Sequence, residues 1–225
     1  MSLYVIQKCA MTLDGFINDA TNARLLISNE ADFDRADQVR AECDAILVGA
    51  GTIRADDPWL LVRSSERRKQ RLGSGRPEHP IKVTLTENGE LDPNAHFFSA
   101  GTGAKIVYCP EEVARTLTER LGGVAEVVGY GTGAVDIPRM LLDLEERGIG
   151  KLLLEAGNTI GTAFLTQGLV NELQISIAPF FVGDPRAPRF VGPGHFYHDQ
   201  SHRMELLHVE RIGDMAFLTY RLKHP

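Results

Sequence analysis

Short apolar runs alternate along this chain with segments in which apolar residues recur every three or four positions. The first pattern is typical of buried strands and the second of amphipathic helices. The runs predict strands at residues 3–10, 45–48, 81–85, 105–109, 124–128, 151–154, 172–178, 204–210 and 216–222. The longer periodic segments predict helices at residues 29–43, 110–121, 137–147 and 159–167.

Strands that alternate with helices predict an α/β fold in three layers, with a mostly parallel central sheet and helices on both faces. The last two strands flank a turn at Gly213 and Asp214, which predicts a C-terminal antiparallel hairpin at a sheet edge. Residues 64–80 and 183–200 are rich in glycine, proline and charge. We interpret them as excursions from one domain that spans residues 1–225.

The composition narrows the class of protein further. A chain of 225 residues can bury a large core, and its net charge of -6 argues against general attraction to nucleic acid. One basic cluster runs from Arg63 to Arg71 and is interrupted by Ser64, Ser65 and Glu66. Its first interpretation is a solvated loop, and its alternative is contact with a phosphate.

The cysteines and the N-terminus indicate where the protein works. Cys9, Cys43 and Cys109 have no recognisable spacing, which is typical of a reduced intracellular protein. The N-terminus has no basic segment followed by an apolar run, and no apolar run approaches membrane-spanning length. We therefore expect a cytoplasmic protein without a signal peptide or a membrane anchor.

Candidate chemistry follows the predicted strand at 45–48, and in parallel α/β sheets ligands bind beyond the carboxyl ends of the strands. The segment 49–52 is built of small residues, which allow the backbone to approach a ligand closely. Thr52 and Asp56, four residues apart, add a hydroxyl and a carboxylate. The structural alternative is a turn punctuated by Asp57 and Pro58.

Arg40 is a second candidate. On a helical wheel it falls inside the apolar arc of Phe33, Ala36, Val39 and Cys43. An arginine there must extend its charge to the surface or meet an anion, because an unpaired buried charge is costly. The partner is either a carboxylate in a structural salt bridge or a ligand phosphate bound through two donors.

The third candidate is the turn after the predicted strand at 151–154. Glu155 stands at the mouth of this strand, and a glycine-containing segment leads into the next helix. The N–H groups at a helix start suit a dinucleotide pyrophosphate. Neither this turn nor the segment 129–133 has the spacing of the dinucleotide fingerprint. These residues alone predict an α/β protein with a phosphate-bearing ligand.

Taken together, these stretches resemble the reductase domain of the bifunctional deaminase–reductase of riboflavin biosynthesis, which has a dihydrofolate-reductase-like fold. The Asp-Asp-Pro sequence at 56–58 and the Glu-Ala-Gly sequence at 155–157 carry much of the resemblance. The matching stretches are 8–15, 40–52, 56–60 with Arg63, 154–157, 168–173 and 177–179. The resemblance covers essentially the whole chain.

The resemblance implies an oxidoreductase like 5-amino-6-(5-phosphoribosylamino)uracil reductase. Such an enzyme reduces the ribosylamino group of a pyrimidine 5′-phosphate to ribitylamino with NADPH. The implied cofactor contacts are Ala10, Thr52, Asp56, Gly157, Asn158, Thr159, Ile160, Gly161, Thr162 and Ala163. The implied substrate contacts are Arg40, Leu60, Arg63 and Glu155, with the two arginines as partners of the phosphate.

The resemblance also assigns candidate roles in the reaction and an oligomeric state. Asp56 and Glu155 are candidates for binding sugar hydroxyls or moving a proton. Members of the family are commonly dimers, so we expect a homodimer, for which the apolar C-terminal hairpin is a candidate interface. Whether the pyrimidine is the diamino or the deaminated form stays open.

The zinc deaminase of the bifunctional protein is not expected in this chain. That enzyme needs His-x-Glu followed by Pro-Cys-x-x-Cys, which supply three metal ligands and a general acid/base. His208 and Glu210 fit the first half, but no cysteine follows them. We predict no deaminase domain and no metal.

Two segments depart from the family pattern. Residues 24–28 read Arg-Leu-Leu-Ile-Ser where the family often has a Ser-Gln-Trp-like segment, and Thr86-Glu87 replaces Asp-Ser after the strand at 81–85. A carboxylate at Glu87 would repel a 2′-phosphate, so NADH stays open beside NADPH. Two alternatives also remain: a dihydrofolate-reductase-like enzyme of another substrate, and a nucleotide-binding module without turnover.

Overall fold

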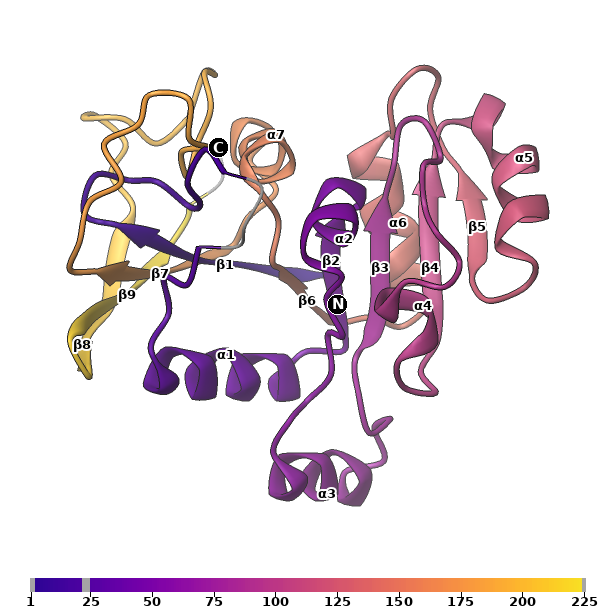
Figure 1. Ribbon diagram of the computed structural model, residues 1–225, viewed down its shortest axis with the longest axis horizontal. Helices are drawn as coiled ribbons and strands as arrows, with labels where there is room; N and C mark the ends of the chain where they lie inside the picture. The colour runs from indigo at the N-terminus through magenta and orange to yellow at the C-terminus, as the bar shows by residue number, and fades with distance from the viewer. Residues whose placement is uncertain (1–2, 22–24, 224–225) are drawn as a thin grey trace. The chain divides into compact units, whose positions relative to one another are not determined.

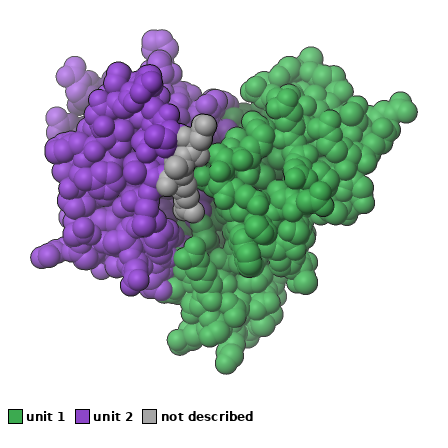
Figure 2. All heavy atoms as spheres, viewed as in Figure 1, with its two compact units in different colours: residues 1–3, 37–153 green, residues 4–36, 154–225 purple. Residues whose placement is uncertain are grey.

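The computed structural model describes residues 3–21 and 25–223 (Figure 1). The chain divides into two units, which are described separately (Figure 2). Unit 1 comprises residues 1–3 and 37–153, and unit 2 comprises residues 4–36 and 154–225. The boundaries fall within helix α1 (Glu30–Glu42) and at the end of strand β6 (Lys151–Leu154). The expectation of a single domain stays a prediction.

Unit 1 is built on parallel strands. Its strands lie in the order β5-β4-β3-β2-β6, and the pairs β2–β3, β3–β4 and β4–β5 are parallel. The strands besides β6 are β2 (Ala45–Gly49), β3 (Ile81–Leu85), β4 (Lys105–Cys109) and β5 (Glu126–Gly129). Its helices are α2 (Ala50–Asp56), α3 (Ser65–Gly73), α4 (His96–Ser99), α5 (Glu111–Leu121) and α6 (Ile137–Glu146).

Helices cover both faces of this parallel sheet, as the strand–helix alternation predicts. Lys82 of β3 donates its ammonium group to the carbonyls of Phe97 and Ala100 at α4. Tyr108 of β4 donates its hydroxyl to Asp143 of α6. Leu85 is the register partner of Tyr108, and it lies three positions from Lys82. Because side chains alternate along a strand, α4 and α6 cover opposite faces.

Two segments expected to be loops are helices. Helix α2 lies where the sequence predicted only small residues and a turn, and α3 lies in the excursion expected at 64–80. Ser64 caps α3 by accepting from the Arg67 N–H at 3.3 Å. Arg71 of α3 is only 1% exposed and donates to the carbonyls of Ala41 at 2.8 Å and Cys43 at 2.7 Å. The interpretation of 63–71 as a solvated loop was therefore wrong, because most of the segment forms α3 and Arg71 donates to backbone carbonyls at the C-terminal end of α1.

Unit 2 contains a mixed sheet in the strand order β1-β7-β9-β8. The pair β1–β7 is parallel, whereas β7–β9 and β8–β9 are antiparallel. Its further elements are β1 (Tyr4–Thr12), α7 (Asn158–Thr166), β7 (Glu172–Ala178), β8 (Glu205–Ile212) and β9 (Met215–Arg221). The predicted hairpin is confirmed, and its turn uses a left-handed Gly213 with φ of 65°.

The predicted fold class is confirmed: an α/β protein with mostly parallel strands and a C-terminal antiparallel hairpin. The hairpin contributes Ile212, Met215 and Phe217 to a small apolar cluster that also contains Ala178 of β7. Among residues 3–21 and 25–223, none of the helices has the length and apolar character required to span a membrane.

Candidate functional site

Helix α2 presents two of the predicted cofactor residues in unit 1. It begins directly after β2, and no side chain caps its Gly49 N-cap. Thr52 is half-buried and Asp56 is exposed, and residues four apart lie on one side of a helix. A Cβ atom added to Gly51 would meet nothing within 4 Å. The start of α2 therefore has open space beside it, as the close approach of a ligand requires.

The chain after α2 is held in an unusual backbone conformation. Asp57 and Leu60 have φ of 41° and 51°, a left-handed region that non-glycine residues seldom adopt. Asp57 accepts a hydrogen bond of 2.7 Å from the His96 N–H, and its second oxygen lies 2.7 Å from His96 Nδ1. Trp59 packs on the same imidazole, with ring centroids 5.1 Å apart. Residue His96, which sequence reasoning missed, therefore fixes this loop.

The predicted substrate residues of unit 1 lie on α1 and on the loop before α3. Arg40 is half-buried in the last turn of α1, whereas Arg63 is exposed and Leu60 is 3% exposed. Of the residues predicted to form an apolar arc around Arg40, Val39 and Cys43 are buried. Phe33 and Ala36, its other members, are only half-buried.

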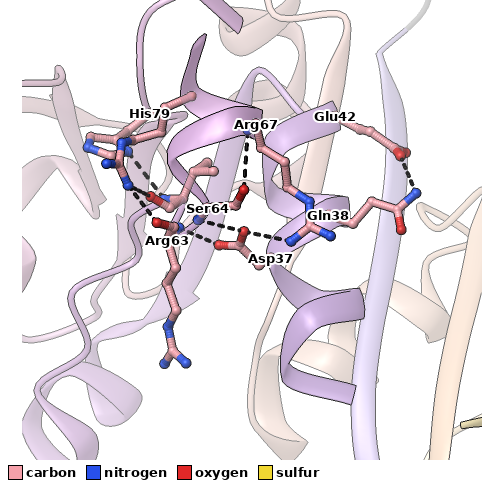
Figure 3. Close-up of polar contacts among 9 residues, drawn as sticks. Asp37, Gln38, Glu42, Arg63, Ser64, Arg67 and His79 are labelled. Carbon is pink, nitrogen blue, oxygen red and sulfur yellow. Dashed lines mark hydrogen bonds and ion pairs between the residues drawn. The ribbon is translucent and has the colours of Figure 1, made fainter. Parts of the chain in front are cut away.

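Sequence reasoning missed Asp37, an acidic residue that α1 buries in unit 1. Its carboxylate binds the backbone at Arg63 and Ser64 and the guanidinium of Arg67 (Figure 3). No local pattern singled out Asp37, because its partners lie 26 to 30 positions away along the chain.

The start of α7 in unit 2 offers backbone donors to an anion. Gly157 is its N-cap and makes no side-chain cap hydrogen bond, and a Cβ added there would meet nothing within 4 Å. The N–H groups of a first helical turn have no partner within the helix. Asn158 and Ile160 are half-buried and Thr159 is exposed in this turn. The arrangement fits the phosphates of a dinucleotide.

Three members of the predicted run 157–163 also have structural contacts. Asn158 donates its side-chain amide to the Arg189 carbonyl at 2.7 Å, and Thr162 Oγ1 accepts from the Gly192 N–H at 2.8 Å. A Cβ at Gly161 would lie 2.7 Å from Gln7 Nε2, so this glycine allows α7 to pack closely on β1. The last member, Ala163, is half-buried. The contacts of this run with a cofactor stay a prediction.

Ala10 and Glu155, the other predicted residues of unit 2, are both half-buried. Ala10 lies on β1 in register with Ser176 of β7, and two positions earlier Lys8 forms a buried ion pair with Asp32 of α1 at 2.8 Å. Sequence reasoning missed this pair. The one signal for it was that Lys8 begins the stretch 8–15, which matches the family pattern.

The pair is held by a hydrogen-bond network in unit 2. Ser28 and Ser176 both donate their hydroxyl groups to the Asp32 carboxylate. Burial by itself would raise the pKa of Asp32. The Lys8 charge and the hydrogen bonds from Lys8, Ser176 and Ser28 outweigh it and lower that pKa below its ordinary value.

The two segments that depart from the family pattern are 24–28 and Thr86-Glu87. Arg24 lies outside the described residues, whereas Ser28, at the end of the same segment, binds Asp32. Glu87 is exposed two residues after the end of β3, in a turn where Thr86 Oγ1 accepts from the Gly89 N–H at 3.1 Å. The Glu87 carboxylate is therefore accessible to a ligand that approaches the end of β3.

The partial deaminase pattern lies on the predicted C-terminal hairpin. His208 Nε2 lies 3.2 Å from Glu210 on the exposed strand β8. Within the described ranges, no three His, Cys, Asp or Glu side chains are grouped as a metal ion would need. His208 and Glu210 thus form a surface pair.

The fold is that of a dihydrofolate-reductase-like α/β protein. Dihydrofolate reductase from Enterococcus faecalis superposes with a TM-score of 0.53 over 98% of this chain and 97% of that chain, at 10% identity. More specifically, the chain belongs to the family of the RibD C-terminal domain, which matches residues 3–218. The predicted family is confirmed.

Two relatives of similar length have the same name. The 2,5-diamino-6-ribosylamino-4(3H)-pyrimidinone 5′-phosphate reductase of Methanothermobacter thermautotrophicus is 36% identical over 99% of this chain and 100% of the relative. The reductase of the same name from Archaeoglobus fulgidus is 32% identical over 98% and 99%. RibD from Acinetobacter baumannii superposes with a TM-score of 0.80 at 25% identity, over 99% of this chain. The chain spans 59% of the length of that RibD.

Proposed function

We propose that this protein is a reductase of riboflavin biosynthesis that converts the ribosylamino group of a pyrimidine 5′-phosphate to ribitylamino. The observation that carries the proposal is the match to pyrimidinone phosphate reductases over nearly the full length of both chains. The family and the retained Arg40, Arg63, Asp56 and Glu155 support it. We infer that the substrate is the diamino pyrimidinone, the form that the names of both archaeal relatives print.

The proposed reaction needs one hydride and one proton. The C1′–O4′ bond of the ribose opens, the proton of the attached amine nitrogen moves to O4′, and C1′ forms an imine with that nitrogen. Reduction at C1′ and protonation of the nitrogen then give the ribitylamine. Asp56 and Glu155 are the side chains proposed to bind the sugar hydroxyls and to move these protons. Arg40 and Arg63 are proposed to bind the 5′-phosphate, and Leu60 to contact the substrate.

NADPH is the proposed cofactor, and when bound it supplies the hydride. The uncapped start of α7 and the open space at Gly157 and Gly51 fit a dinucleotide. We propose that the backbone at Gly157–Ala163 binds its phosphates, and that Ala10, Thr52 and Asp56 contact the rest of it. Glu87 leaves NADH as the alternative, because its carboxylate would repel a 2′-phosphate.

Incubation of the purified protein with each pyrimidine and each nicotinamide cofactor tests the proposal. We expect loss of reduced-nicotinamide absorbance with the diamino substrate and a ribitylamino product in the mass spectrum. Preference for the deaminated pyrimidine would overturn only the substrate assignment. Consumption of neither pyrimidine would overturn the reductase proposal. Cofactor binding without any turnover would favour a binding module.

We also propose that the protein is a cytoplasmic homodimer that pairs through β8. This strand is last in the order of unit 2 and exposes Leu206, Leu207 and Val209. In an antiparallel pair centred on His208, Glu205 of each copy would face Arg211 of the other, so the charges are complementary. Light scattering of Val209→Lys tests this proposal: a monomer supports the β8 interface, and an unchanged dimer overturns it.

A further inference from the structure

Asp37 of α1 is a buried carboxylate of unit 1 that three donors bind. This residue is 3% exposed and accepts hydrogen bonds from the Arg63 N–H, from the Ser64 N–H at 3.1 Å and from Arg67 Nη1 at 2.9 Å (Figure 3). A buried carboxylate requires such donors, because an unpaired buried charge is strongly destabilising. Asp37 therefore holds the chain at Arg63 in place.

The Arg63 peptide is also held from its carbonyl side. Arg68 Nη1 donates to the Arg63 carbonyl at 2.6 Å and to the Val62 carbonyl at 3.2 Å. The Val62 N–H in turn donates to His79 Nδ1 at 3.2 Å. The N–H and the carbonyl of Arg63 are thus both bonded, and the backbone cannot turn there without breaking charge-assisted hydrogen bonds.

The side chain of Arg63 is not part of the contacts that hold its backbone to Asp37 and Arg68. In Figure 3 the Arg63 guanidinium points away from Asp37, which binds the Arg67 guanidinium instead. Arg67 and the two amides compensate the charge of Asp37, so this carboxylate opposes an anion near Arg63 only weakly. The contacts fix the backbone of Arg63 and direct its cationic end elsewhere.

We infer that Asp37 is a positioning residue for substrate binding: with Arg68 it fixes the Arg63 backbone so that the guanidinium meets the 5′-phosphate. This inference rests on the proposed role of Arg63. A bidentate arginine–phosphate contact depends on the orientation of the guanidinium plane. Asp37 thereby contributes to affinity for the phosphate without contacting the substrate.

The test compares Asp37→Asn with the native full-length chain on the phosphorylated substrate, on its nucleoside without phosphate, and on inorganic phosphate by calorimetry. We expect the KM for the phosphorylated substrate and the Kd for phosphate each to rise about tenfold, because charge-assisted hydrogen bonds are lost. We expect kcat, and kcat/KM for the nucleoside, to stay near the native values. Arg68→Ala is expected to act in the same direction, and it decides the question if Asp37→Asn does not fold.

Asp143→Asn is the matched control, because Asp143 is also a hydrogen-bonded carboxylate of unit 1, bound to Tyr108 and Arg147. It should leave the Kd for phosphate unchanged. An equal loss on both substrates, or a native Kd for phosphate in Asp37→Asn, would overturn the positioning role. Absence of turnover by the native chain, with weaker phosphate binding in Asp37→Asn, would overturn the proposed function and leave the positioning role standing.

Discussion

The ammonium group of Lys8 lies 2.8 Å from Oδ1 of Asp32, and the two residues are 7% and 1% exposed. Removing one partner of such a pair leaves an uncompensated buried charge. Asp32→Ala should therefore lower the free energy of unfolding by about 3–5 kcal/mol, measured by urea denaturation.

The control for Asp32 is Glu205→Ala in the same unit, because Glu205 forms an exposed ion pair with Arg221 at 3.5 Å. An exposed pair contributes about 0–1 kcal/mol. Equal losses in the free energy of unfolding would show that the buried Lys8–Asp32 pair stabilises the protein no more than an exposed ion pair does.

Gly157→Ala tests the proposed cofactor contact at the start of α7. Gly157 has φ of −69°, which alanine adopts readily, and the added Cβ would meet no protein atom within 4 Å. We therefore expect native stability and a KM for NADPH raised about tenfold, equivalent to about 1.4 kcal/mol of lost binding. Gly73→Ala makes the same change in open space at the end of α3 and should alter neither quantity.

Arg40→Ala tests the proposed phosphate contact on α1. Loss of charged hydrogen bonds of about 1.5–3 kcal/mol should raise the KM for the phosphorylated substrate roughly 10- to 100-fold. Cofactor affinity should stay nearly native. Gln38→Ala on the same helix is the control, because Gln38 binds Glu42 at 3.1 Å. Equal loss of substrate and cofactor affinity in Arg40→Ala would mean that Arg40 is structural.

Glu87→Ser tests the cofactor preference. If the Glu87 carboxylate repels a 2′-phosphate, its removal should raise kcat/KM for NADPH relative to NADH by about fivefold, since a nearby exposed charge contributes about 1 kcal/mol. Steady-state kinetics with both cofactors measures this ratio. Glu90→Ser changes a second exposed acid of the same turn and is the control. An unchanged ratio would place the 2′-position away from Glu87.

His79 should make the stability depend on pH. Burial lowers its pKa, as Arg68, Lys82 and Arg71 also do, and Glu78 opposes them. Because the folded-state pKa lies below the ordinary value near 6.5, the unfolded chain takes up the proton first. The stabilisation is thus complete above pH 6.5 and is lost as the pH falls through the folded-state pKa.

The comparison of native protein and His79→Asn isolates this contribution. Urea midpoints at about pH 7.5 and pH 5.5 should differ more in the native protein, because the variant cannot take up a proton at this position. Equal differences in the two proteins would mean that folding does not lower the pKa of His79.

The strands and the class of fold were predictable from the sequence because their signal is local. The predicted ranges 81–85, 105–109, 151–154 and 172–178 coincide with β3, β4, β6 and β7. Buried parallel strands are continuous apolar runs, so the strand and its burial are encoded in the same few residues. The candidates at strand ends followed from that placement, because ligands bind there in parallel sheets.

Only the tertiary structure decided which charged side chains are buried and which groups compensate their charge. Asp32 and Ser176 lie 144 positions apart, Asp37 and Arg63 26 apart, and Asp57 and His96 39 apart. A charge can be buried only where donors from elsewhere in the fold compensate it, and no local pattern records which donors those are. For that reason the sequence predicted Arg71 in a solvated loop, whereas folding buries it against carbonyls at the C-terminal end of α1.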